Sequence, residues 1–271
     1  MTDPAATAAL FDVPTPVEQL LLLAAEFTRH NDMLDIRAPH HATVPLADTL
    51  GASAVRLSAA TRAAISTVQE QRLPANAELA AVLTRLTQLA HLSSGSVGQD
   101  HHVARALTTW APEAAVDCAE VLAAETRRRT GTAIAARQLT SGEHTALTDI
   151  ARGHACADNS LGRDRTRSRE NRVPVSALRT LESQGLVHRV PRTVPPAYPG
   201  GPHWDRIHLT PAGITALAPV LGLSPASPST NRSRTRLAPR HLSPPGTSTH
   251  LLNQPTEPPL SRNHRSTHHR P

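Results

Sequence analysis

The chain has 271 residues, a net charge of +6 and an aromatic content of only 2%. This length allows one large domain or two small ones, and a core must be built mainly from Leu, Ala, Val and Ile, which favours helices. The longest apolar run, Leu20 to Ala25, is too short to cross a membrane, so we expect a cytoplasmic protein with no membrane segment. The two cysteines, Cys118 and Cys156, make no disulfide framework.

Charge is distributed unevenly along the chain. Residues 1–138 carry 11 arginines against 14 acidic residues, residues 139–223 carry 10 against 7, and residues 224–271 carry 7 against 1. The positive charge is therefore concentrated in the C-terminal half, where it would attract a polyanion. Residues 224–271 are also rich in Pro, Ser, Thr and His and have too few apolar residues to offset the entropy of ordering, so we expect a disordered basic tail.

The N-terminal half has the pattern of helices joined by short loops. We expect residues 1–13 to be a disordered leader and residues 14–131 to form a bundle-like helical module. Prolines and an N-capping asparagine mark the helix starts. The predicted helices run from Pro16 to about His30, from Ser53 to Gln71, from Asn76 to a turn at 93–98, from Val103 to Trp110, and from Pro112 to Gly131, with a loop at 37–47.

Two apolar stripes in this module recur at a spacing of three and four residues, as on helix faces that pack against other helices. They extend over Leu20 to Phe27 and over Leu79 to Leu89. The stripes either bury each other within one chain or make residues 14–131 a dimerisation module. The second alternative includes a small-molecule pocket between helices, for an effector that the sequence does not identify.

Residues 139–223 follow a different pattern, of short helices and strands. Thr140 and Glu143 match a capping box, in which a hydroxyl and a carboxylate satisfy free backbone amides at a helix start. Residues 175–184 have one apolar and one polar helical face, and Gly185 is suited to end that helix. We then expect a strand at 186–190, a long turn, a strand at 206–209, and a helix from Thr210-Pro211 to Leu221 that ends before Gly222.

The segment 153–173 connects the first two of these helices and is compatible with two structures. Residues 153–162 have turn chemistry, and arginines then occur at almost every second position from Arg163 to Arg172. This alternation suits an extended ribbon as well as a helix. Both alternatives stay open.

Three motifs in combination resemble the winged-helix transcription regulators, and most closely the MarR-like ones. They are Leu-Thr…Glu…Ala-Leu…Ile-Ala from residue 139, Leu-Arg-Thr-Leu-Glu-Ser-Gln-Gly-Leu-Val-His-Arg at 178–189, and Arg-Ile-His-Leu-Thr-Pro-Ala-Gly at 206–213. The resemblance covers residues 139–222 only. It implies a winged helix-turn-helix DNA-binding domain in which helix 175–184 enters the major groove of double-stranded DNA. Together with the helical module before this domain, we expect a mainly α protein that binds DNA sequence-specifically as a transcriptional regulator. The turn chemistry at 153–162 departs from that family, which has a helix there.

The candidate DNA-contacting residues form three groups. Arg179 can donate two hydrogen bonds to guanine, and the small polar side chains beside it can contact phosphates or bases. The alternating arginines suit phosphate contacts, and the arginines near the two strands suit contacts of a wing with the backbone or minor groove. A solvated, partly paired surface is the alternative for each group. The full set is Arg163, Arg165, Arg167, Arg169, Arg172, Ser176, Arg179, Thr180, Ser183, Gln184, Arg189, Arg192 and Arg206.

Other chemistry has less support in the sequence. His154-Ala-Cys156 is not followed by a second pair at zinc-finger spacing, and the histidine doublets lie in predicted loops or the tail, so we expect no bound metal. Motifs of nucleotide-binding proteins, zinc proteases and serine hydrolases are absent, and we expect neither catalysis nor a cofactor. An adaptor that uses the winged helix to bind a partner protein is the main alternative function. A small helical enzyme is the least favoured one.

Overall fold

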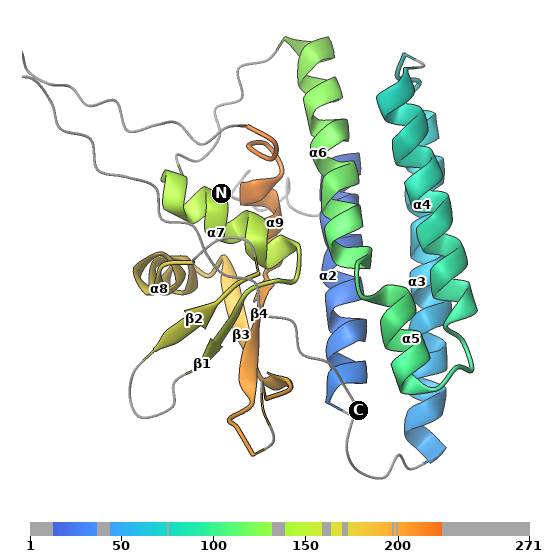
Figure 1. Cartoon of the computed structure of the whole chain (residues 1–271). Coiled ribbons are helices and arrows are strands. Elements are labelled where there is room, and N and C mark those ends of the chain that lie inside the picture. Colours follow the sequence, from blue (N-terminus) through green and yellow to red (C-terminus); the bar gives the residue numbers. More distant parts are fainter. Residues whose placement is uncertain are drawn as a thin grey trace, which may run out of the picture. The chain divides into compact units, whose positions relative to one another are not determined.

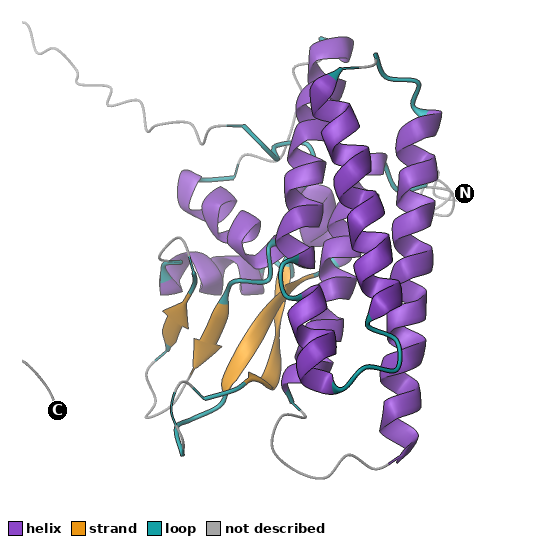
Figure 2. Cartoon of the chain, turned by 45° about the vertical axis from the view of Figure 1, so that its right-hand side comes forward, coloured by secondary structure: helices purple, strands orange, loops and turns teal. Residues whose placement is uncertain are grey.

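A computed structural model describes residues 13–36, 44–74, 76–131, 139–158, 164–169, 173–196, 198 and 200–223. All of these residues belong to one compact unit. It is mainly helical and includes a small antiparallel sheet (Figures 1 and 2). The expected leader at 1–12 and the expected tail at 224–271 lie outside the described residues.

The first half of this unit is helical, as the sequence predicts. Local signals set the helix ends: Thr15 and Glu18 form a capping box, Asn76 and Asp100 accept hydrogen bonds from amides of the following turn, and Gly131 ends a helix at a φ of 61°. The helices are α2 (Pro16–Asp35), α3 (Val44–Glu70), α4 (Ala77–Gly95), α5 (His101–Thr108) and α6 (Ala111–Thr130).

Several of the predicted boundaries in this half were wrong, among them the end of α4, which continues to Gly95 through the first residues of the predicted turn at 93–98. Helix α2 continues to Asp35 because its last turn carries carboxylates that bind other elements. Helix α3 begins at Val44, so residues 44–47 of the predicted loop are helical, and Pro45 stands in the first turn, where proline is tolerated. Helix α5 begins at His101 because Asp100 caps it.

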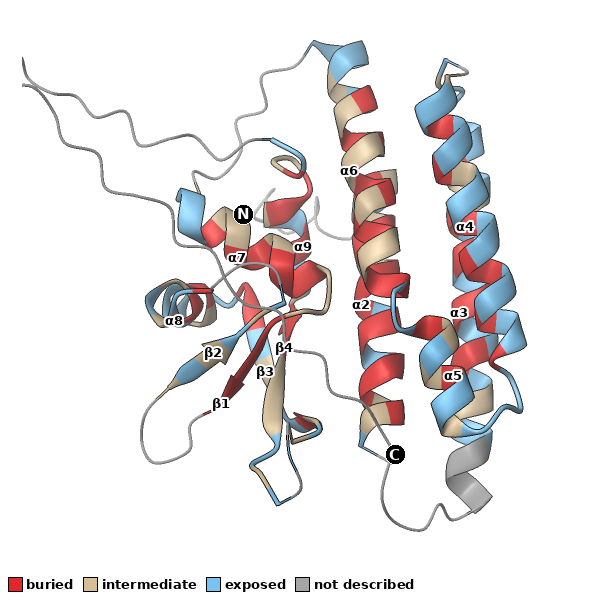
Figure 3. Ribbon diagram, viewed as in Figure 1, coloured by how far each residue is buried: buried red, intermediate tan, exposed pale blue. Residues whose placement is uncertain are grey.

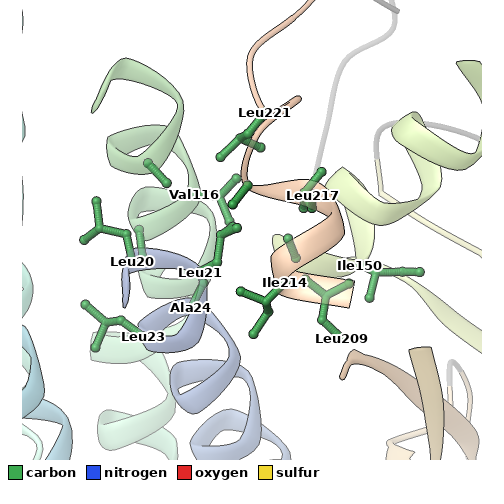
Figure 4. Close-up of a cluster of buried hydrophobic side chains, with 14 of the residues drawn as sticks. Leu20, Leu21, Leu23, Ala24, Val116, Ile150, Leu209, Ile214, Leu217 and Leu221 are labelled. Atoms are coloured by element: carbon green, nitrogen blue, oxygen red, sulfur yellow. The ribbon is translucent and has the colours of Figure 1, made fainter. Parts of the chain in front are cut away.

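Helices α2 and α6 lie side by side between α3 and α4 and the second half of the chain (Figure 1). Helix α2 packs along α6 and against α3, and on another side it touches β3 (Val187–Val194), β4 (Trp204–Leu209) and α9 (Pro211–Leu217). Figure 4 shows Leu20 and Leu23 pointing to the side opposite Leu217. A single hydrophobic cluster extends through both halves. Figure 3 shows buried residues on elements of both halves.

Both apolar stripes are buried inside the chain. Leu20 and Phe27 on α2 and Leu86 on α4 have no exposed surface. The two helices pack mainly on α3 and α6 rather than on each other. Burial within one chain is therefore what the structure shows for these stripes.

The second half contributes short helices and a four-stranded sheet. In chain order it contains α7 (Ser141–Ala151), β1 (Cys156–Asp158), β2 (Arg165–Arg167), α8 (Val175–Ser183), β3, β4 and α9. The strands are antiparallel and lie in the order β2-β1-β4-β3. The described parts of the segment 153–173 thus include a β-ribbon, which decides between the two alternatives left open by the sequence.

Local sequence signals again set most of the helix ends in this half. Thr140 and Glu143 form the expected capping box, and Gly185 has a φ of 68° after α8. The Thr210 hydroxyl accepts a hydrogen bond from the Gly213 amide and caps α9. However, α9 ends at Leu217 and not at Leu221, since Pro219 lacks the N–H that continued helical bonding would use.

Candidate nucleic-acid interface

Helix α8 has one buried and one exposed face. Leu178 and Leu181 have no exposed surface and hold the helix against the core. The face on the opposite side is polar and open to solvent. It carries Ser176, Arg179, Thr180 and Ser183, with Gln184 at the C-cap. The sequence predicted this division correctly because the leucines recur at helical spacing.

The arginine on this face already has a partner. Arg179 donates from Nε and Nη2 to Oδ2 of Asp164, at 2.9 and 2.7 Å, although 66% of its side chain is exposed. Hydrogen bonds from Arg179, and secondarily from Arg189, hold the pKa of Asp164 below its ordinary value. Arg189 also pairs with Glu182, at 2.5 Å between Nε and Oε1. Two carboxylates therefore partly neutralise the basic charge on the surface around α8.

The hydroxyls of α8 are turned back to its own backbone. Thr180 donates to the Ser176 carbonyl at 3.0 Å and Ser183 donates to the Thr180 carbonyl at 2.8 Å. Each oxygen keeps its acceptor lone pairs and can rotate its hydrogen toward another acceptor.

Strand β2 precedes α8 and presents two arginines to solvent. Arg165 and Arg167 are exposed, whereas Thr166 between them is half-buried and donates to the Val173 carbonyl at 2.5 Å. Neither arginine has an ion pair among the described residues. The alternation that suggested phosphate contacts is thus the side-chain alternation of a strand.

Other members of the alternating series lie elsewhere. The Arg169 guanidinium stacks over the Trp110 ring, 3.9 Å from its centroid, and its Nη1 is 3.6 Å from Glu113 Oε2. Arg169 therefore lies against the start of α6 and not beside α8. Arg163 and Arg172 lie outside the described residues.

The turn side of β3 and β4 carries one exposed arginine. Arg192 lies in a register irregularity of β3 at a φ of 61°, and its backbone N–H donates to Asp205 Oδ1 at 2.9 Å. Its side chain has no ion pair within the described part of the chain. Tyr198, in the turn between the strands, is 63% exposed.

Arg206 was predicted to contact DNA, and this prediction was wrong. Only 11% of its side chain is exposed, and Nε donates to Asp32 Oδ1 at 3.0 Å while Nη1 donates to the Gly153 carbonyl at 2.7 Å. Arg206 thus connects β4 to α2. The sequence could not show this because its partner lies 174 residues away along the chain.

Neither cysteine is placed for reactivity or metal binding. Burial raises the pKa of the Cys118 thiol to about 12, and burial also raises that of Cys156, so both remain thiols. Among the described residues no group of three His, Cys, Asp or Glu side chains gathers as a metal-ligand set. Within the same part of the chain, no helix combines the length and apolar character needed to cross a membrane.

Comparisons of the chain with known protein families, with curated proteins and with solved structures gave no match.

Proposed function

We propose that residues 139–223 form a winged helix that binds double-stranded DNA, with α8 in the major groove, and that the protein is a non-catalytic transcriptional regulator. The observation that carries the proposal is the exposed polar face of α8 beside the arginines of β2. The order of the elements supports it: a helix, a ribbon, the exposed helix, two paired strands and a final helix. The exposed helix followed by two paired strands and a helix is the part of this order that matches a winged helix, with β3 and β4 as the wing.

Arg165, Arg167 and Arg192 are the phosphate contacts in this proposal. All three are exposed without an ion pair among the described residues, so phosphates would not have to displace a carboxylate. Such contacts give affinity that is independent of sequence and depends on salt.

Arg179 is the proposed base contact, and it must exchange Asp164 for a guanine. A bidentate contact with guanine contributes about 1–3 kcal/mol of discrimination between bases. When Arg179 leaves, Asp164 keeps Arg189, whose Nη1 lies 3.3 Å from Asp164 Oδ1, so the carboxylate still has a cationic partner. At other bases Arg179 can stay with Asp164, which adds selectivity.

The β1–β2 ribbon occupies the place of a helix in the winged-helix regulators that the sequence resembles. In this chain Asp164, which directly precedes β2, accepts hydrogen bonds from Arg179 and orients its side chain. The proposal is therefore a winged helix in the general sense, without the two-helix motif of MarR-like proteins.

A homodimer through residues 14–131 stays a prediction. Two α8 helices would be needed to read a palindrome, at a separation of about 34 Å. The stripes that suggested the dimer are buried within one chain, so a dimer would require another surface of this half. Without one, the chain would read a single half-site.

The alternative function is an adaptor that binds a partner protein through α8. Asp164 and Glu182 favour it, because they lie beside the arginines and make this surface mixed in charge. Protein interfaces use such mixed, complementary charges.

Fluorescence anisotropy of a labelled duplex, over a series of salt concentrations, tests DNA binding. The full chain and a chain ending at Leu223 are both needed, because a basic tail alone can bind DNA. We expect the shorter chain to bind, with affinity that falls as salt rises, and the pair Arg165→Gln and Arg167→Gln to reduce the salt slope by about 2. Arg56→Gln, an exposed arginine on α3, is the control. Absence of binding by the shorter chain would favour the adaptor.

A further inference from the structure

A small cavity lies where α2, the corner between α5 and α6, the turn after α7, and β4 meet. Its volume is about 200 Å³. Pockets for drug-sized ligands usually have about 300–1,000 Å³, so this cavity suits a smaller molecule. Five of its lining side chains are basic or can become so, and none is a carboxylate. These five are Arg105, Arg152, His154, Arg169 and Arg206.

Carboxylates outside the lining hold two of the guanidinium groups in place. Asp35 accepts from Nε and Nη2 of Arg105 at 2.7 and 3.2 Å, and Asp32 accepts from Nε of Arg206 at 3.0 Å. Nη1 of Arg105 also donates to the Thr109 hydroxyl at 2.9 Å, and Nη1 of Arg206 donates to the Gly153 carbonyl at 2.7 Å. Each guanidinium has five N–H donors in a planar fork, so these partners still leave donors over. Both side chains are mostly buried, with 27% and 11% exposed, so their geometry is fixed before any ligand arrives.

The turn after α7 supplies the next two groups in the same way. Arg152 donates from Nη2 to Asp117 at 3.2 Å and to Glu120 at 3.0 Å. The His154 side chain is only 9% exposed, and its Nε2 is 3.3 Å from Glu113 Oε2. Its other ring nitrogen, Nδ1, is buried and has no hydrogen-bond partner within the described part of the chain.

Arg169 has one loose ion pair, with Glu113 at 3.6 Å, and the largest unused donor capacity of the lining arginines. Stacking on Trp110 orients the plane of its guanidinium, and the group forms no hydrogen bond to any described residue. Half of its side chain is exposed, which puts Arg169 at the rim of the cavity, where a ligand enters. Planar, oriented guanidinium groups are the usual protein partners of phosphates and carboxylates.

We propose that this cavity is a binding site for a small dianion with oxygen ligands, such as inorganic phosphate or a short dicarboxylate. Arg169 at the rim binds it directly, and the better-paired arginines supply further N–H donors. The site differs from the α8 surface, and the proposal does not depend on DNA binding.

Isothermal titration calorimetry of the full chain with sodium phosphate, and separately with succinate, tests the proposal without DNA. Sodium chloride keeps the ionic strength constant, so that general salt effects cancel. We expect saturable binding at one site for at least one of the two anions. Arg169→Gln should weaken it about tenfold or more, because it removes charge-assisted hydrogen bonds.

Two further variants make the result specific. Arg165→Gln removes an exposed arginine that does not line the cavity, so its affinity for the anion should equal that of the wild type. Thr109→Glu places a carboxylate at the cavity from an exposed position, and should abolish binding while circular dichroism shows an unchanged fold. Absence of saturable binding, or equal weakening by Arg165→Gln and Arg169→Gln, would overturn the proposal.

Discussion

Asp32 on α2 and His208 on β4 lie 2.7 Å apart, from Oδ2 to Nε2, although 176 residues separate them in the chain. Both side chains are almost fully buried, with 5% and 2% exposed. The other carboxylate oxygen of Asp32 accepts from Arg206 at 3.0 Å. One carboxylate therefore binds two residues of β4, on either side of Ile207, and joins the helical half of the chain to the sheet.

Asp32→Asn should destabilise the protein strongly. The amide keeps the size of the side chain but removes the charge that balances Arg206, and a buried ion pair that loses one partner costs about 3–5 kcal/mol. Asp35 remains 3.7 Å from Arg206 and partly balances its charge. We therefore expect the free energy of unfolding to fall by about 3 kcal/mol, the lower end of that range. Urea denaturation measures it.

Glu26→Gln, on the same helix, is the control for this change. Glu26 pairs with Arg29 on the surface, where about half of each side chain is exposed. Exposed pairs contribute about 0–1 kcal/mol. Equal effects of the two substitutions would show that the Asp32 contacts do not hold the two halves together.

His30 should make stability depend on pH. Burial, with a smaller effect of the positive charge on Arg105, lowers the pKa of its imidazole from 6.5 to about 4. Between these two pH values the unfolded state binds a proton that the folded state does not bind, so the free energy of unfolding falls as the pH falls. The slope due to His30 should reach about 1.4 kcal/mol per pH unit, and its contribution should be constant above this window.

Denaturation of the wild type and of His30→Asn across that window checks this prediction. Asn can keep a hydrogen bond to Ser53, which lies 3.1 Å from Nδ1 of His30, but it does not titrate. We expect the stability of the variant to depend less steeply on pH. Parallel curves for the two proteins would mean that His30 is not kept neutral by the fold.

Gly213→Ala should destabilise the start of α9. A Cβ atom at Gly213 would lie 2.1 Å from the Leu186 carbonyl oxygen, which cannot withdraw freely because it also accepts from the Thr210 amide at 3.0 Å. Overpacking of this kind lowers the free energy of unfolding by about 1–3 kcal/mol. The loss should lie at the upper end of this range, because the clash is with a backbone atom. A melting experiment measures the effect.

Gly142→Ala is the matched control for that substitution. Gly142 stands in the first turn of α7, and nothing lies within 4 Å of its added Cβ. Alanine is the better helix former, so this variant should be as stable as the wild type or slightly more stable. If both alanines were tolerated equally, the start of α9 could not approach the Leu186 carbonyl as closely as described.

Features that depend on nearby residues could be predicted from the sequence. Thr140 with Glu143, Asn76 and Gly131 each act within one helical turn, and each sets a helix end as expected. The exposed face of α8 also follows from spacing alone, because Leu178 determines which side is buried.

Features that depend on distant residues could not be predicted. The composition near Arg206 gives no sign of a partner on α2, and the same basic residue type occurs at Arg192, which is exposed. Likewise, Arg169 belongs to the alternating series by sequence, yet Trp110 holds it against α6. The anion site escaped prediction for this reason: its residues come from five separate elements and turns.

Selection of bound duplexes from a randomised pool, with the full chain and with Arg179→Ala, tests DNA reading by α8 most directly. We expect the wild type to enrich a motif that contains a guanine at one fixed position. The variant should lose about 1–3 kcal/mol of specific affinity and its preference at that position, while the rest of the motif persists. A wild-type chain that enriches no motif, or a variant that enriches the same motif with the same affinity, would contradict the proposed role of α8.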